Sequence, residues 1–130
     1  MLISLMSYLF GGLDALLLAL IAMIAIDFIS GVFKAVILRD ITSEKMFMGG
    51  VKKVGILCIV AVANIVCSVL DKDGLLRSLT ISYFIANEGL SLLENWSMLG
   101  LPVPPGLRNV LAQLHGEKKE KKEKEDESEG

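Results

Sequence analysis

Two long apolar runs constrain this chain more than any other feature. The first begins at Leu13 and contains LLLALIAMIAI before it reaches Asp27, and the second is uncharged from Val54 to Leu70. An α-helix rises about 1.5 Å per residue, so roughly 20 residues cross the ~30 Å hydrocarbon core of a bilayer. Both runs are of spanning length, and the sequence therefore predicts an all-α integral membrane protein.

A third segment, residues 75–99, is equally long but carries two carboxylates and two carboxamides. Gly100 and the prolines that follow it end the helix, because glycine favours the C-terminal cap and proline cannot continue the helix. A charged residue at the centre of a spanning helix costs roughly 2.5–3.5 kcal/mol, whereas a leucine returns only about 0.3–0.6. This helix is therefore marginal in lipid by itself and needs partners, or water, along its polar side.

Glycines, prolines and charges divide the rest of the chain. Leu107, Val110, Leu111 and Leu114 recur with the spacing of a short amphipathic helix. Gly11 and Gly12 predict a break, so we expect a short helix at the membrane surface before the first span. A continuous helix from the N-terminus is the alternative. The predicted elements are an interfacial segment (1–12), a first span (13–38), a cytoplasmic loop (39–45), a second span (46–70), an external turn (71–74), a third span (75–99), a proline-rich turn with an amphipathic helix (100–115) and a disordered charged tail (116–130).

Basic residues predict the orientation of the three spans. Positively charged loops stay in the cytoplasm, and the first connection with its flanks is much richer in lysine and arginine than the second. The N-terminus is therefore expected outside and the C-terminus inside, with Lys52 and Lys53 reaching the lipid headgroups. The residues taken to determine topology are Arg39, Lys45, Lys52 and Lys53.

Composition excludes several classes of function. The tail holds five of the 13 basic and seven of the 15 acidic residues, so the acidic pI mostly reflects the tail. Basic patches interleaved with aromatic residues, as nucleic-acid binding needs, do not occur. His115 is the only histidine, and Cys58 and Cys67 point to opposite sides of one helix. We expect neither an enzyme nor a site for a metal or cofactor.

The polar residues of the third span form one stripe. They fall within an arc of about 120° on a helical wheel, opposite a leucine-rich face. The other spans offer weaker polar positions at Asp27, Lys34 and Asn64. These groups can meet inside a three-helix monomer, as interhelical hydrogen-bonding groups, or they can line an aqueous lumen between copies. A proton-binding role for one glutamate is a further alternative. The stripe residues are Thr80, Asn87, Glu88, Ser91, Glu94 and Asn95.

The run ANEGLSLLEN followed by GLPVPPGL resembles the toxin-secretion and phage-lysis holin family. DFISGVFKA and TSEKMFMGGVKKV, before and after the first connection, agree with that resemblance. One departure is Asn64, where members often carry an acidic residue within the second span. The positions that match the family's motifs are Asp27, Gly31, Lys34, Asn87, Glu88, Glu94, Asn95, Pro102 and Pro104.

The resemblance implies a protein of the bacterial cytoplasmic membrane that accumulates, forms homo-oligomers and opens lesions in the bilayer. An endolysin or a toxin would then leave through the lesion, as a functional partner that need not bind the protein directly. The residues themselves also allow an ion- or proton-translocating subunit and a membrane assembly protein that forms no pore. A holin predicts an abrupt, density-dependent loss of membrane potential, which neither alternative does.

Overall fold

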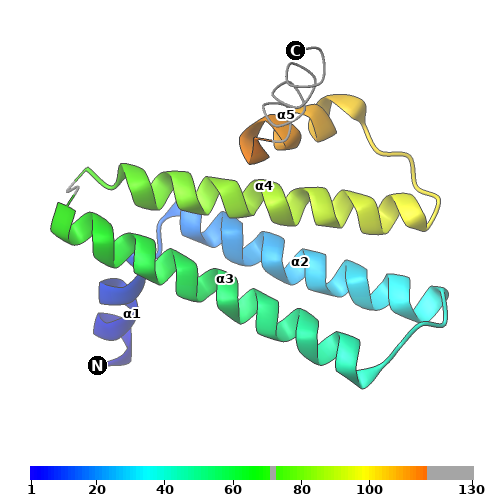
Figure 1. The fold of residues 1–130 in the computed structure, drawn as a ribbon, viewed down its shortest axis with the longest axis horizontal. Coiled ribbons are helices and arrows are strands. Elements are labelled where there is room, and N and C mark those ends of the chain that lie inside the picture. The colour runs from blue at the N-terminus through cyan, green and yellow to red at the C-terminus, as the bar shows by residue number, and fades with distance from the viewer. Residues whose placement is uncertain (71–72, 117–130) are drawn as a thin grey trace, which may run out of the picture.

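The computed structural model describes residues 1–70 and 73–116. Within them the chain forms five helices and no strands, which confirms the all-α prediction (Figure 1). The expected charged tail, from 117 onward, and residues 71 and 72 of the expected external turn lie outside the described residues. The helices are α1 (Leu2–Phe10), α2 (Ala15–Ile37), α3 (Ser43–Leu70), α4 (Leu75–Met98) and α5 (Pro105–His115).

A sharp break separates α1 from α2. Gly11 and Gly12 have φ angles of 78° and 103°, in the left-handed region that glycine adopts at little cost. Asp14 then caps α2, since its carboxylate accepts a hydrogen bond of 2.9 Å from the backbone N–H of Leu17. The chain therefore turns here, and the alternative of one continuous helix from the N-terminus is wrong.

The connection between α2 and α3 is short. Arg39 has a left-handed φ of 55°, and α3 begins at Ser43, a few residues before the expected start near Met46. The earlier start has a local cause, because the hydroxyl of Thr42 accepts a hydrogen bond of 3.3 Å from the backbone N–H of Lys45.

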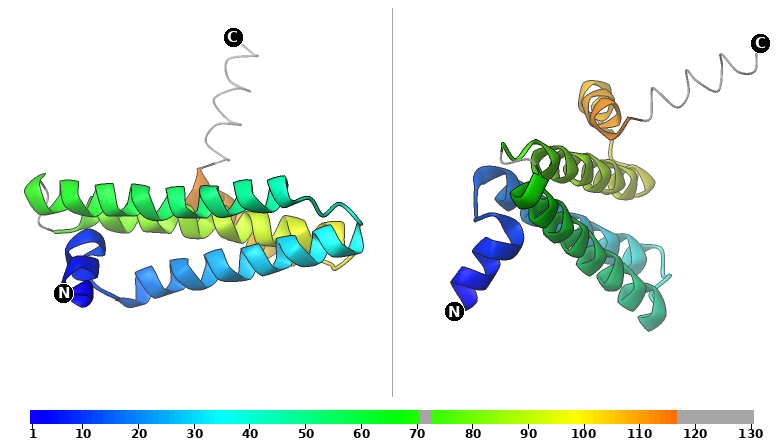
Figure 2. Two further views of the ribbon diagram at one scale, coloured as in Figure 1. Left: turned by 90° about the horizontal axis from the view of Figure 1, so that it is seen from below. Right: turned by 60° about the vertical axis from the view of Figure 1, so that its left-hand side comes forward.

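Helix α4 is the centre of the packing. It lies lengthwise against both α2 and α3, which contact each other little, so the three long helices run side by side (Figures 1 and 2). Their apolar core is formed by Leu17, Leu20, Ile56, Val60 and Ile81.

The outer faces of α2 and α3 are apolar and exposed, as Ile29 and Phe33 on α2 and Ile59 and Val62 on α3 illustrate. Among the described helices, these two are long and apolar enough to cross a membrane. Helix α4 has 24 residues, a length of about 36 Å, but it is more polar.

Helix α5 folds back over α4 and covers the side that faces away from α3 (Figure 2). Leu111 packs on Gly89, where a Cβ atom would come within 2.9 Å of the Leu111 Cδ1 atom. Farther along, the ring of His115 stacks on Tyr83 with a centroid separation of 4.7 Å. Leu107, Val110 and Leu114 of this helix remain exposed and so can face lipid.

Candidate functional site

Polar residues from all three long helices meet inside the bundle. We call this group the central polar cluster: Asp27 and Ser30 of α2, Lys53 of α3, and Glu88 and Asn95 of α4. The Lys53 Nζ atom lies 2.5 Å from the Asp27 Oδ2 atom and 2.5 Å from the Glu88 Oε2 atom. One ammonium group thus joins a carboxylate of α2 to a carboxylate of α4.

The carboxamide of Asn95 completes the cluster. Its Nδ2 atom donates to the Asp27 Oδ1 atom at 3.2 Å and to the Ser30 Oγ atom at 2.9 Å. Ser30 in turn donates to the backbone carbonyl of Asp27 at 2.8 Å. Asp27 therefore receives hydrogen bonds from both other helices, as a buried carboxylate requires.

Burial makes this arrangement sensitive to change. Asp27 is 4% exposed and Glu88 1%, whereas the Lys53 side chain is 21% exposed. Removing one partner from a buried ion pair typically costs about 3–5 kcal/mol, because the other charge is left uncompensated. The cluster therefore fixes the rotation and the register of α2, α3 and α4 relative to one another.

The position of Lys53 corrects the sequence analysis. We expected its side chain at the lipid headgroups, but its ammonium lies between two carboxylates inside the bundle. Lys52 is exposed. A signal was available in the sequence, since Lys53 lies on the same face of its helix as Asn64.

The structure divides the predicted stripe between the inside and the outside of the bundle. Glu88 and Asn95 are buried in the central polar cluster, whereas Glu94 is exposed. The other three members, Thr80, Asn87 and Ser91, are half-buried. The edge of α4 that carries Glu94 is therefore left uncovered by residues 1–70 and 73–116.

The remaining predicted site residues lie apart from this cluster. Lys34 contacts the sulfur of Met98, with 3.8 Å between Nζ and Sδ. Lys45 forms an exposed ion pair of 2.6 Å with Asp40, and Arg39 is exposed in the connection between α2 and α3.

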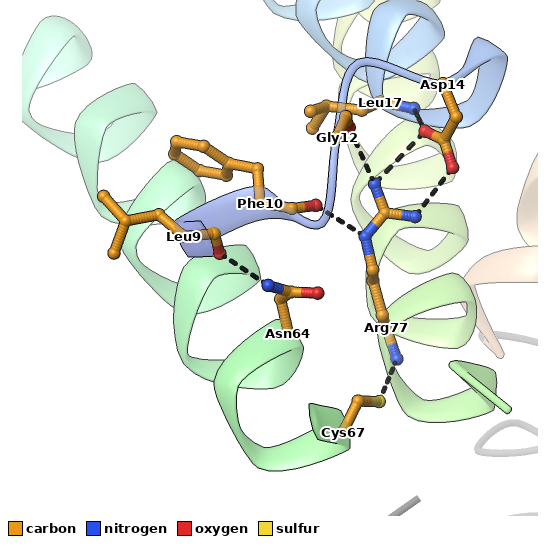
Figure 3. A network of polar contacts seen from close by, with 8 residues as sticks. All are labelled: Leu9, Phe10, Gly12, Asp14, Leu17, Asn64, Cys67 and Arg77. Carbon is orange, nitrogen blue, oxygen red and sulfur yellow. Dashed lines mark hydrogen bonds and ion pairs between the residues drawn. The ribbon is translucent and has the colours of Figure 1, made fainter. Parts of the chain in front are cut away.

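A second group of polar contacts holds the N-terminal end, and we call it the N-terminal polar cluster (Figure 3). The guanidinium of Arg77 binds both carboxylate oxygens of Asp14, at 2.8 and 3.1 Å. Its Nε atom also donates to the carbonyl of Phe10 at 2.7 Å, and its Nη2 atom donates to the carbonyl of Gly12 at 3.3 Å. Arg77 of α4 thereby holds the turn between α1 and α2.

Asn64 attaches α1 to α3 beside that turn. Its Nδ2 atom donates to the carbonyls of Tyr8 and Leu9, at 2.8 and 3.1 Å. These carbonyls belong to the last turn of α1 and have no partner within the helix, so Asn64 caps the end of α1. Asn64 thus serves as an interhelical hydrogen-bonding group, one of the two roles considered for it.

Hydrogen bonds from Arg77, and then from the backbone N–H of Leu17, hold the pKa of Asp14 below its ordinary value. Sequence reasoning missed this pair. Asp14 had a local signal, as an aspartate directly before an apolar helix, but nothing in the sequence indicated that Arg77 is its partner.

The central polar cluster can hold the three long helices together, because Lys53 of α3 binds carboxylates of both α2 and α4. In the part of the chain that the structure describes, no three His, Cys, Asp or Glu side chains gather as metal ligands would. Asp27 and Glu88 are bridged by Lys53 instead. The chemistry available here is the pairing and separation of charges between helices.

Comparison with known proteins identifies relatives over almost the whole chain. A model of the bacteriophage holin family matches residues 4–116. The "probable holin" of Bacillus phage phi105 is 36% identical over 124 residues, which cover 95% of this chain and 91% of that protein. No solved structure matches the chain.

Relatives also occur in bacterial genomes. The uncharacterized protein YqxH of Bacillus subtilis is 36% identical, over 95% of this chain and 87% of its own length. An uncharacterized 14.9 kDa protein from the nagH 3′ region of Clostridium perfringens is 34% identical, over 88% of each chain.

Proposed function

Because the chain belongs to the bacteriophage holin family, we propose that it accumulates in the bacterial cytoplasmic membrane and oligomerises there into lesions. An endolysin or a toxin would leave the cell through these lesions without binding the protein directly. The protein itself would catalyse no reaction. The family and the two apolar helices indicate a membrane protein, and the lesion is our inference from the polar stripe.

We place α4 in the membrane as a third span, with the N-terminus outside and the C-terminus inside. The support is its packing along α2 and α3, since a helix aligned with two spanning helices crosses the same depth of lipid. Its buried residues Glu88 and Asn95 are paired with Lys53 of α3 and Asp27 of α2, respectively, which lowers the cost of placing them in hydrocarbon.

The division of the stripe supports a change from a closed monomer to an open assembly. In the monomer, Glu88 and Asn95 are satisfied internally, while Glu94 and the half-buried residues beside it lack this shielding. As copies accumulate, their exposed edges would associate, because a polar edge costs free energy in lipid. Separation of the central polar cluster would then turn the whole stripe toward water.

The test is induced expression in bacteria together with a cytosolic endolysin that lacks an export signal. Membrane potential and culture density are followed in the same culture. Sudden depolarisation, followed by lysis only when both proteins are present, is the expected result. Depolarisation without release of the endolysin would exclude a lesion of protein size and leave only a small pore.

One observation favours an ion- or proton-translocating subunit as a second candidate. A cavity at the loop end of α2 and α3 reaches Asp27, so this end can provide access to a buried carboxylate. That function predicts saturable flux at low expression with complete dependence on one carboxylate. A lesion predicts instead an abrupt onset at a threshold density.

A further inference from the structure

A cavity opens between α2 and α3 beside Asp27. It has a volume of about 350 Å³ and lies where α2 ends and α3 begins. Gly31 and Gly49 line it, and a Cβ atom at Gly49 would meet nothing within 4 Å. The absence of side chains at these glycines helps to keep the space open between two helices that contact each other little.

The depth of the cavity in the membrane follows from the length of α2. Its 23 residues span about 35 Å, slightly more than the ~30 Å of hydrocarbon. Lys34 lies one turn before the end of this helix, so its ammonium is at the level of the lipid headgroups. Phe28, Leu38 and Met46 supply apolar walls to the same cavity, as a space between headgroups and acyl chains requires.

Lys34 is the lining residue that favours an anion. Three lysines and two aspartates line the cavity. Asp40 pairs with Lys45, and Asp27 shares the ammonium of Lys53 with Glu88, which lies outside the lining. Among the described residues, no carboxylate lies within ion-pair distance of Lys34, whose polar contact is the weakly accepting sulfur of Met98.

We propose that this cavity binds the headgroup of an anionic phospholipid, with the lipid phosphate on the Lys34 ammonium and an acyl chain along the apolar wall. Basic pockets between membrane helices bind anionic headgroups in this way. A zwitterionic lipid brings its own cation and so gains less from the Lys34 ammonium. The site depends on α2 and α3 spanning the membrane and does not depend on lesion formation.

The experiment uses a fluorophore that the chain already contains. Trp96 is the only tryptophan, and its ring lies 6.3 Å from that of Phe33, the residue before Lys34. The full-length protein is reconstituted in vesicles that mix phosphatidylglycerol with phosphatidylcholine, and one lipid at a time carries bromine on its acyl chains. Stronger quenching of Trp96 by the brominated phosphatidylglycerol measures the preference for the anionic lipid.

Lys34→Gln is expected to reduce that preference about fivefold, the effect of one lysine near an anionic headgroup. Lys52→Gln is the matched control, because it removes the same charge from an exposed position outside the cavity. Lys34→Arg, which keeps the charge, should retain the preference.

Three results would overturn the proposal. Equal quenching by the two brominated lipids in the wild type would show that the site has no preference for an anionic lipid. An equal loss in Lys34→Gln and Lys52→Gln would mean that surface charge acts without the cavity. Removal of the preference by inorganic phosphate, but not by sodium chloride of equal ionic strength, would assign the cavity to a soluble anion.

Discussion

Lys53 is the side chain on which the interior of the bundle depends most. Its ammonium is shared by Asp27 and Glu88, and each of these carboxylates comes from a different helix. A buried carboxylate needs direct pairing with a cation, because little water reaches it to screen its charge. Single substitutions in this cluster therefore have effects that exposed ion pairs such as Asp40–Lys45 do not show.

Lys53→Met should lower the free energy of unfolding by about 3–5 kcal/mol, since it leaves two buried carboxylates side by side without a cation. Unfolding in mixed detergent micelles, titrated with a denaturing detergent, measures the change. Lys52→Met removes the same charge from the exposed face of the same helix and should change stability by about 0.5 kcal/mol or less. Similar losses in the two variants would contradict an internal role for Lys53.

Replacing Glu88 and Glu94 together with glutamine should shift the time or the extent of membrane permeabilisation, because the stripe would lose both of its carboxylates. The single variants separate two contributions. Glu88→Gln alters the closed bundle, where Glu88 binds Lys53, while Glu94→Gln alters only an exposed edge. Lysis is timed at equal expression. Unchanged kinetics in the double variant would show that neither residue lines the lesion.

At the level of elements, the two short helices are attached to the long ones by different means. Polar contacts hold α1, through Arg77 and Asn64, whereas an apolar contact between Leu111 and Gly89 and one ring stack hold α5. The attachment of α1 should therefore respond to pH, and that of α5 should respond to the volume of the side chain at position 89.

Asp14→Asn should weaken the attachment of α1 at neutral pH. The pKa of Asp14 is lowered in the folded protein, so its ion pair stabilises the fold above the ordinary aspartate pKa, about 3.9. That contribution is lost as the pH falls through the lowered pKa. The difference in unfolding free energy between wild type and variant should hence shrink toward zero in acid. A difference independent of pH would contradict the pairing with Arg77.

Gly89→Val should displace α5, because even a Cβ atom at this position comes within 2.9 Å of the Leu111 Cδ1 atom and 3.0 Å of the Met23 Cε atom. Overpacking of this kind costs about 1–3 kcal/mol. Trypsin should then cleave after Arg108, within α5, severalfold faster. Gly55→Val is the control, since a Cβ atom there meets nothing within 4 Å. Equal cleavage in the two variants would mean that α5 does not depend on this contact.

For the whole molecule, the proposed orientation can be tested with single cysteines, after Cys58 and Cys67 are replaced by serine. A membrane-impermeant thiol reagent added to intact cells should label Ser4→Cys and leave Asp40→Cys unlabelled. Disruption of the membrane should expose the second site. Labelling of Asp40→Cys in intact cells would show that the orientation is the reverse of the one proposed.

Two further cysteine sites test whether α4 crosses the membrane. If α4 crosses the membrane, Asp73→Cys, just before α4, should be labelled in intact cells, and Leu101→Cys, just after it, should not. Equal labelling at the two positions would show that α4 does not cross.

The sequence by itself was sufficient for what depends on neighbouring residues. Long apolar runs indicated α2 and α3, Gly11 and Gly12 indicated the break before α2, and the prolines after Gly100 indicated the end of α4. In each case the physical cause is local, because backbone conformation and helix caps depend on residues a few positions apart.

The tertiary structure decided which polar groups meet. Lys53 could face headgroups or carboxylates, and Arg77 could face water or Asp14, because a helical wheel gives the face of a residue but not the rotation and register of the opposing helix. That choice depends on how the side chains of three helices pack along their whole length. The sequence thus predicted a polar stripe on α4, and only the packed bundle divided it into a buried part and an exposed edge.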